Sequence, residues 1–246
     1  MSFNFKDSNF YNENTILDIS MIVDWNKKRR KYNFDKLPLT AIISLDKNLL
    51  SRKVRFVSKK AKGLVGNNYI INNNFMYASN FGNGAPALIG HLEELRCLGV
   101  ENFIFIGLGG SLIFNESRNN SFILKNTFST SGCTTLYSMK DSFKPIKNEW
   151  YNNLKSKLNL AETIGWSTDA PFRETPSLLN YYREKKVTHV DMESASIYAF
   201  SEFYKLNAMC IIVSADDLTN NRWTPPQNVD KLNNIINSII TICSKT

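Results

Sequence analysis

The sequence predicts a single α/β domain. Short apolar runs alternate with amphipathic stretches of helical spacing, and glycines follow several of the apolar runs. No internal repeat and no linker interrupts this pattern. Such an alternation is typical of strands and helices that pack into one α/β core. With 246 residues, 43% of them hydrophobic, the chain is long enough to bury one sizeable core.

The first third of the chain divides into a polar start and a series of expected elements. Residues 1–36 are polar apart from apolar patches at 16–19 and 21–25, so we interpret them as an N-terminal extension, either a short packed helix or a divergent segment. The domain then spans residues 37–246. Residues 39–45 are its first expected central strand. Residues 48–61 are expected to form a basic helix whose inward side chains are Leu49, Leu50, Val54 and Val57.

Glycine, proline and asparagine mark the next elements. An Asn-rich turn at 72–74 separates two strand-like runs, 68–71 and 75–79, which predicts a β-hairpin. Pro86 suits the first turn of a helix over 87–98, and Gly99 is a natural stop for that helix. A buried strand at 103–106 runs into the glycine-rich segment 107–111, which we interpret as a turn at the strand end.

The remaining elements follow the same alternation. We expect strands at 122–124 and 162–166, a small-residue loop at 127–137, and helices at 145–158, 176–186 and 228–243. In the stretch 187–218, two apolar runs flank one amphipathic helix and end in acidic residues. Open α/β sheets build their sites at the carboxyl ends of strands, so these carboxylates predict a site.

Charge and cysteine usage exclude several classes of function. The net charge of +8 is concentrated in residues 1–62; we interpret this as a solvated face, with an anion site or a weak nucleic-acid patch as alternatives. Because no nucleic-acid-binding motif accompanies it, we do not expect a nucleic-acid partner. No run approaches about 20 apolar residues, so no membrane partner is expected. Four dispersed cysteines and two histidines argue against a metal site and for a cytoplasmic protein without a signal peptide.

Three motifs carry candidate chemistry. Gly107, Gly109 and Gly110 resemble a dinucleotide motif superficially, but a polar, poorly helical stretch follows them, so we expect no nicotinamide cofactor. They still allow a ligand to approach the backbone. Asp191 either caps the next helix or contacts a ligand, whereas Glu193 suits the hydroxyls of a ribose.

The third motif is the loop at 168–175. An aromatic side chain such as Phe172 can stack on a base, and Arg173 can pair with a phosphate or a carboxylate. The alternative is a structural turn held by an Arg–Glu ion pair.

Five segments, in order, resemble the purine nucleoside and uridine phosphorylase superfamily, which also contains nucleosidases that use water. They are residues 80–99, 105–112, 168–175, 190–199 and 213–218. The resemblance implies a three-layer α/β/α domain around a central mixed, partly barrel-like sheet. It also implies cleavage of the N-glycosidic bond of a nucleoside, a purine in preference to a pyrimidine, with no cofactor, by a homo-oligomer such as a dimer, trimer or hexamer.

The resemblance also implies roles for individual residues. Glu193 matches the glutamate that binds the ribose hydroxyls and stabilises the cationic sugar, and Met192 matches a methionine under that sugar. Asp216 matches the aspartate that protonates or hydrogen-bonds the departing base. Phe172 matches a position near the base. The further substrate contacts that we expect are Asp191, Arg173, Gly84, Gly107, Leu108 and Gly109.

The chain departs from the family where phosphate is usually held. The Gly and Arg that normally follow the first strand are absent from residues 44–49, Phe105 replaces a second arginine, and Leu108 replaces a small hydroxyl residue. Lys47 or Arg52 are possible substitutes. The nucleophile is therefore either phosphate, as a co-substrate, or water. The alternative is a degenerate member that binds a nucleoside without catalysis and serves storage or regulation.

Overall fold

A mixed sheet runs through the centre of the molecule. The computed structural model describes residues 10–29, 31–45, 50–113, 121–226 and 229–244, and within these ranges it has one 10-stranded sheet. The strands are β1 Thr40–Ser44, β2 Lys59–Lys60, β3 Asn67–Ile70, β4 Phe75–Ser79, β5 Asn102–Ser111, β6 Ser121–Ser129, β7 Ser142–Phe143, β8 Ala161–Ser167, β9 His189–Asp191 and β10 Asn207–Asp217.

Half of this sheet closes into a barrel. The strands follow the order β10–β6–β8–β9–β5, and β5 pairs again with β10. Along its other edge, β5 pairs first with β1, over residues 102–106, and then with β9, over Gly110 and Ser111. The sheet therefore divides at the glycine-rich part of β5: one branch continues through β1, β4, β3 and β2, and the other closes the barrel. The predicted mixed, partly barrel-like sheet is confirmed.

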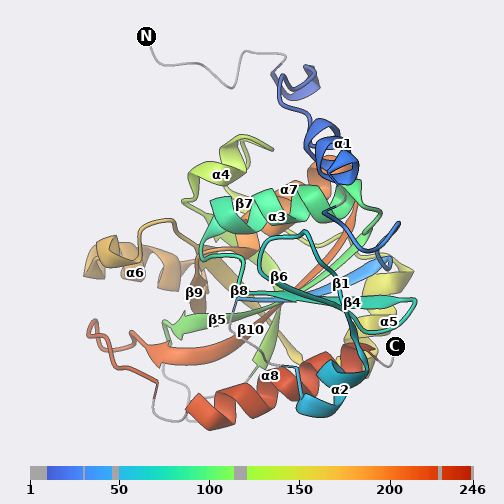
Figure 1. Cartoon of the computed structure of the whole chain (residues 1–246). Helices are drawn as coiled ribbons and strands as arrows, with labels where there is room; N and C mark the ends of the chain where they lie inside the picture. The colour runs from blue at the N-terminus through green and yellow to red at the C-terminus, as the bar shows by residue number, and fades with distance from the viewer. Residues whose placement is uncertain (1–9, 30, 46–49, 114–120, 227–228, 245–246) are drawn as a thin grey trace.

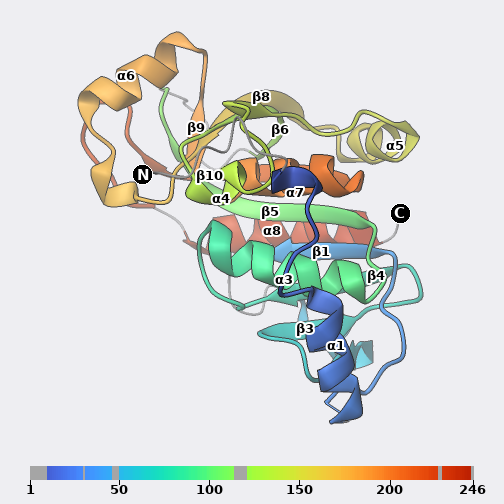
Figure 2. The same ribbon diagram turned by 90° about the horizontal axis from the view of Figure 1, so that it is seen from above.

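Helices cover both faces of the sheet (Figure 1). They are α1 Ile19–Lys28, α2 Arg52–Val57, α3 Ala85–Cys97, α4 Gly132–Thr135, α5 Glu149–Leu158, α6 Pro176–Glu184, α7 Ser194–Tyr204 and α8 Val229–Ser244, with 3-10 turns at Phe10–Asn12 and Pro171–Arg173. One hydrophobic core joins α1, α3 and α7 to the sheet, and a second joins α5 and α8 to the opposite face. A third cluster fills the space between α6, β8 and β9. Figure 2 shows α7 above β5 and α8 below it.

Most elements lie where the sequence predicts them. The β3–β4 hairpin is antiparallel across its Asn-rich turn. Helix α3 begins at Ala85, two residues before the predicted start. Its N-cap residue is Gly84, whose φ is 85°. The helix buries Leu88, Leu92 and Leu95 and ends before Gly99, whose φ is 100°, as a left-handed helix stop requires.

Three expectations about local structure are wrong. Of the predicted basic helix over 48–61, only α2, Arg52–Val57, is described as helical. Lys59–Lys60 instead pairs with β3 as an edge strand. Val57 is 76% exposed instead of inward, and Leu49 lies outside the described residues. Residues 107–111 are part of β5 and not a turn. The predicted loop at 127–137 contains the end of β6 and the short helix α4.

The N-terminal helix α1 is anchored to α3. Val23 is 1% exposed, and Asn26 donates a hydrogen bond to the hydroxyl of Tyr32 at 3.2 Å. That hydroxyl donates in turn to Glu94 of α3 at 2.7 Å. Val23, with Ile19 packed beside it, thus contributes to the core, whereas Ile16, Leu17 and Met21 are exposed. The boundary of the extension at residue 36 stays a prediction. No helix in the described ranges has both the length and the apolar character that crossing a membrane requires.

One tyrosine ties α7 to the barrel. Tyr198 is fully buried, and its hydroxyl donates to the carbonyl oxygen of Leu124 in β6 at 2.6 Å. The same hydroxyl accepts a hydrogen bond from the backbone N–H of Cys210 in β10 at 3.0 Å. Tyr198 therefore ties α7 to β6 and β10, two neighbouring strands of the barrel.

Replacing Tyr198 by phenylalanine should destabilise the protein. The substitution leaves a buried carbonyl and a buried N–H without this partner, which costs about 1–3 kcal/mol. Chemical denaturation should show the corresponding loss in the free energy of unfolding. Tyr181→Phe is the matched control, since Tyr181 is 52% exposed, and it should leave stability unchanged. Equal stability of both variants would contradict the role of Tyr198 in joining β6 to β10.

Candidate active site

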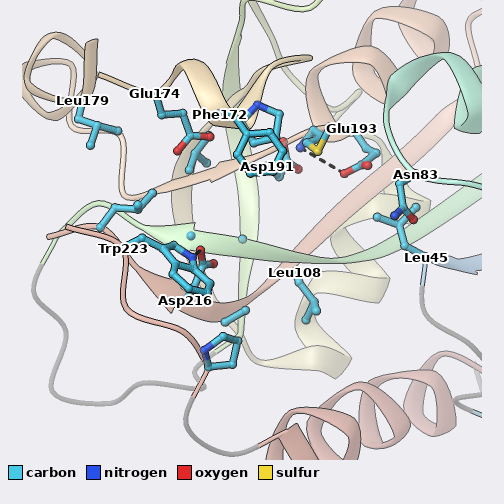
Figure 3. Close-up of a pocket in the computed structure, with 18 of the residues that line it drawn as sticks. Leu45, Asn83, Leu108, Phe172, Glu174, Leu179, Asp191, Glu193, Asp216 and Trp223 are labelled. Atoms are coloured by element: carbon cyan, nitrogen blue, oxygen red, sulfur yellow. Dashed lines mark hydrogen bonds between the residues drawn. The ribbon is translucent and has the colours of Figure 1, made fainter. Parts of the chain in front are cut away.

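A large cavity lies at the edge of the sheet where the acidic residues gather (Figure 3). Its volume is about 1230 Å³, enough for a drug-sized ligand. Seven of the predicted site residues line it: Leu108, Gly109, Phe172, Asp191, Met192, Glu193 and Asp216. The predicted motifs, which are far apart in the sequence, thus meet around one space.

The strand directions explain why these residues meet. Strands β1, β4, β5 and β10 are parallel neighbours, so the residues that follow them reach the same edge of the sheet. Strand β9 runs antiparallel to β5, with Val190 opposite Gly110. It therefore brings Asp191 and the two residues after it back along β5 into the cavity.

Glu193 is a buried carboxylate held by backbone groups. It is 2% exposed; its Oε1 accepts a hydrogen bond from the N–H of Gly84 at 2.8 Å, and its Oε2 accepts one from the N–H of Met192 at 3.2 Å. Burial, and next the neighbouring Asp191 carboxylate, raise the pKa of Glu193. Gly84 is not among the residues that line the cavity: its position supports Glu193 rather than direct contact with a ligand.

Asp191 is bonded inside the protein. Its carboxylate accepts hydrogen bonds from the hydroxyls of Ser167 and Ser194 and from the N–H of Ser194 at 3.2 Å. Ser194 is the first residue of α7, so the predicted capping interaction is present, although Asp191 also borders the cavity. Burial raises the pKa of Asp191.

A β-bulge separates the roles of the two acidic residues that end β10. Gly109 pairs with Ser214 and Ser111 pairs with Asp217, so β10 has one residue more than β5 in this interval. Such a bulge redirects a side chain, and Asp216 borders the cavity. Asp217 instead accepts hydrogen bonds from the N–H and the hydroxyl of Thr219, at 2.7 and 2.6 Å.

Gly110 gives Asp216 the room that it occupies. A Cβ at this position would lie 3.3 Å from Asp216 Oδ1 and 3.0 Å from the side chain of Leu218. On its other side, Asp216 Oδ2 accepts a hydrogen bond from the indole N–H of Trp223 at 2.7 Å. The Asp216 carboxylate is therefore held between a glycine and an aromatic donor.

Sequence reasoning missed Glu174 and Trp223. Glu174 lines the cavity, and burial, followed by the charge of Asp216, raises its pKa to about 7. The available signal was its place in the same loop as Phe172. Trp223 lies in a polar segment after β10 whose sequence shows no pattern, so only the fold brings it to Asp216.

Of three further predicted contacts, one lines the cavity and two do not. Phe172 lines the cavity at the tip of its turn and is 100% exposed. Arg173 is exposed and is not among the lining residues. Gly107 is not among them either; a Cβ there would lie 2.6 Å from the ring of Phe105, so its lack of a side chain serves core packing.

The end of the cavity away from Asp216 has no basic side chain in the described ranges. Leu45, Asn83 and Leu108 line it, close to Glu193 (Figure 3), and Ser44 also borders the cavity. Among the described residues that border the whole cavity, none is Lys, Arg or His. Phe105 is fully buried in the core, and Lys47 lies outside the described residues. In the ranges that the structure describes, no three His, Cys, Asp or Glu side chains gather as a metal site would require.

The chain is similar to curated proteins and to a solved structure that are all named purine nucleoside phosphorylases. It is 24% identical to the DeoD-type purine nucleoside phosphorylase of Brevibacillus brevis over 168 residues, 65% of this chain and 70% of that protein. It is 24% identical to the DeoD-type enzyme of Thermoanaerobacter pseudethanolicus over 159 residues, 61% of this chain and 67% of that protein.

The fold agrees with these relatives. The structure of purine nucleoside phosphorylase from Toxoplasma gondii, in complex with immucillin-H, superposes with a TM-score of 0.67 at 18% identity, covering 84% of this chain and 90% of that one. The family model of the phosphorylase superfamily matches residues 69–241, well over half of the chain. From this match, the chain belongs to the phosphorylase superfamily.

Proposed function

We propose that this chain cleaves the N-glycosidic bond of a purine nucleoside, with water as the nucleophile. One observation carries the proposal: a single cavity holds the buried carboxylate of Glu193 and, on another element, the carboxylate of Asp216. Breaking this bond produces a cationic sugar and an anionic base. A carboxylate beside the sugar and an acid beside the base stabilise both developing charges.

Glu193 suits the sugar. Its two backbone donors fix the carboxylate without neutralising it with a basic side chain. Burial disfavours the charged form of Glu193. A cationic sugar beside it in the same dry cavity would stabilise that charged form. The interaction is strongest when the sugar carries positive charge, which is the condition for lowering a barrier. Met192, the residue before Glu193, also lines the cavity.

The opposite wall suits a purine. A purine can leave as a neutral base when its N7 takes a proton, and Asp216 is the acidic group that the bulge directs into the cavity. The exposed ring of Phe172 offers a face on which a base can stack. The curated relatives are themselves named purine nucleoside phosphorylases.

The lack of a basic side chain among the described lining residues favours water over phosphate. A bound phosphate dianion needs charge-assisted donors such as Arg or Lys, and the described lining residues include neither. Ser44 and Asn83 offer neutral polar groups to which a water can bond. The missing phosphate contacts also favour a second candidate, a protein that binds a nucleoside without cleaving it.

Base release should not depend on phosphate. We expect the protein to release base from a purine nucleoside at the same rate in phosphate-free buffer and in phosphate, with free pentose as the other product. Chromatography of both products provides the measurement. A strict requirement for phosphate, with pentose 1-phosphate formed, would show that a phosphate site exists after all. Calorimetric binding without release from any nucleoside would favour the non-catalytic candidate.

Glu193→Gln should lower kcat by about 10²–10³-fold, because it removes the charge that faces the sugar cation while keeping an acceptor for Gly84. Steady-state kinetics with the best purine nucleoside provide the measurement. Glu202→Gln is the control, because Glu202 is on the same helix, α7, and pairs with Lys140 at the surface. Turnover retained by Glu193→Gln would refute the assignment of Glu193 to the sugar.

A further inference from the structure

Two carboxyl groups border the part of the cavity that we assign to the base. Glu174 follows the Pro171–Arg173 turn, and Asp216 ends β10 at its bulge. Both line the cavity, and Figure 3 shows their side chains reaching toward the same space from different elements, with the Trp223 ring beside Asp216. Two like charges in a partly dry space repel each other, so such a pair retains a proton that a lone carboxylate would lose.

Among the described residues that line the cavity, no side chain is a cation that could relieve this repulsion. The other titratable side chains that line the cavity in the described ranges are the carboxyls of Asp191 and Glu193. Arg183, on α6, is occupied elsewhere, by Asn180, Asn221 and backbone carbonyls of the 218–219 segment and Leu112. Arg173 is exposed and does not line the cavity. In agreement with this, the pKa of Glu174 is raised to about 7, by burial and next by Asp216.

Trp223 makes the two members of the pair unequal. Its indole N–H donates to Asp216 Oδ2. Glu174 has no such fixed donor in the described contacts. Because burial and next the charge of Asp216 raise the pKa of Glu174, Glu174 is the member of the pair that holds a proton near neutral pH.

We propose that Glu174 and Asp216 form one acid, in which Glu174 carries the proton that the departing purine takes at N7. This inference rests on the proposed function and adds a residue that the sequence motifs do not assign.

The chemistry of the step is balanced. As the bond between C1′ and N9 breaks, its electron pair goes to the base, and N7 takes the proton of the pair, so the base leaves as a neutral 7H tautomer. The attacking water supplies hydroxide to C1′ and releases one proton. That proton restores the Glu174–Asp216 acid, and the net reaction is addition of one water to the nucleoside.

The decisive comparison uses a substrate whose base needs no proton. 7-Methylguanosine already carries a methyl group and a positive charge at N7. At about pH 6, where Glu174 is protonated, Glu174→Gln should slow the cleavage of inosine or guanosine about 10²-fold, the usual contribution of a general acid. Cleavage of 7-methylguanosine by the same variant should stay within about threefold of wild type. Glu184→Gln, an exposed residue at the end of α6, should change neither rate.

The pH dependence provides a second readout that a structural role would not move. Because the acid must be protonated, kcat/KM of the wild type for inosine should fall as the pH rises through about 7, and Glu174→Gln should lack this limb. In ¹³C NMR of labelled glutamate carboxyls, the signal that Glu174→Gln removes should titrate near the same pH. A midpoint near the ordinary glutamate value of about 4.3 would overturn the proposal.

The remaining outcomes separate this inference from the proposed function. Two outcomes would overturn the shared acid while leaving nucleoside cleavage intact. One is equal slowing of both substrates by Glu174→Gln. The other is a fall of kcat/KM with rising pH that Glu174→Gln leaves unchanged. Failure of the wild type to cleave either substrate would overturn the proposed function, and the inference with it.

Discussion

The hydrogen bond from the N–H of Gly84 to the carboxylate of Glu193, at 2.8 Å, is the contact on which the site depends. It joins the turn before α3 to the turn before α7, and these turns follow different strands of the sheet. Gly84 adopts a φ of 85°, a conformation that other residues rarely reach. The bond therefore couples the position of a buried charge to the packing of two helices against the core. Moving either helix would move the carboxylate.

The barrel supplies the other wall of the cavity. Strand β5 changes neighbours from β1 to β9, and the glycines at this point leave room for Phe105, Ile212 and the Asp216 carboxylate. The extra residue in β10 then separates Asp216, which faces the cavity, from Asp217, which holds its own loop. The β5–β10 pairing, which closes the barrel, thus also positions the acid at the base end. Stability of the barrel and geometry of the site are consequently linked through few residues.

The sequence predicted local elements and strand-end carboxylates well, because periodicity and the ends of apolar runs report on them directly. The hairpin and α3 are examples; the mixed, partly barrel-like sheet was implied by the family resemblance. It failed where tertiary contacts decide: Lys59 and Lys60 pair as an edge strand although their segment looks helical, and the glycines of β5 stay extended because two neighbours hold them. Glu174 was missed although it lies in the matched loop at 168–175, and Trp223 was missed because it belongs to no spaced pattern. Their relation to Asp216 exists only in the folded chain, whereas that of Glu193 to its helix is local.

The central claim is that one cavity separates a cationic sugar from a departing base, with water at the end that Leu45, Asn83 and Leu108 line. A crystal structure with a bound purine nucleoside, grown in the presence of phosphate, tests it most directly. The account predicts ribose hydroxyls on Glu193, the purine N7 facing the Glu174–Asp216 pair, and water beside Ser44 and Asn83. A nucleoside bound in the reverse orientation, or a phosphate ion held beside Ser44 and Asn83, would contradict it.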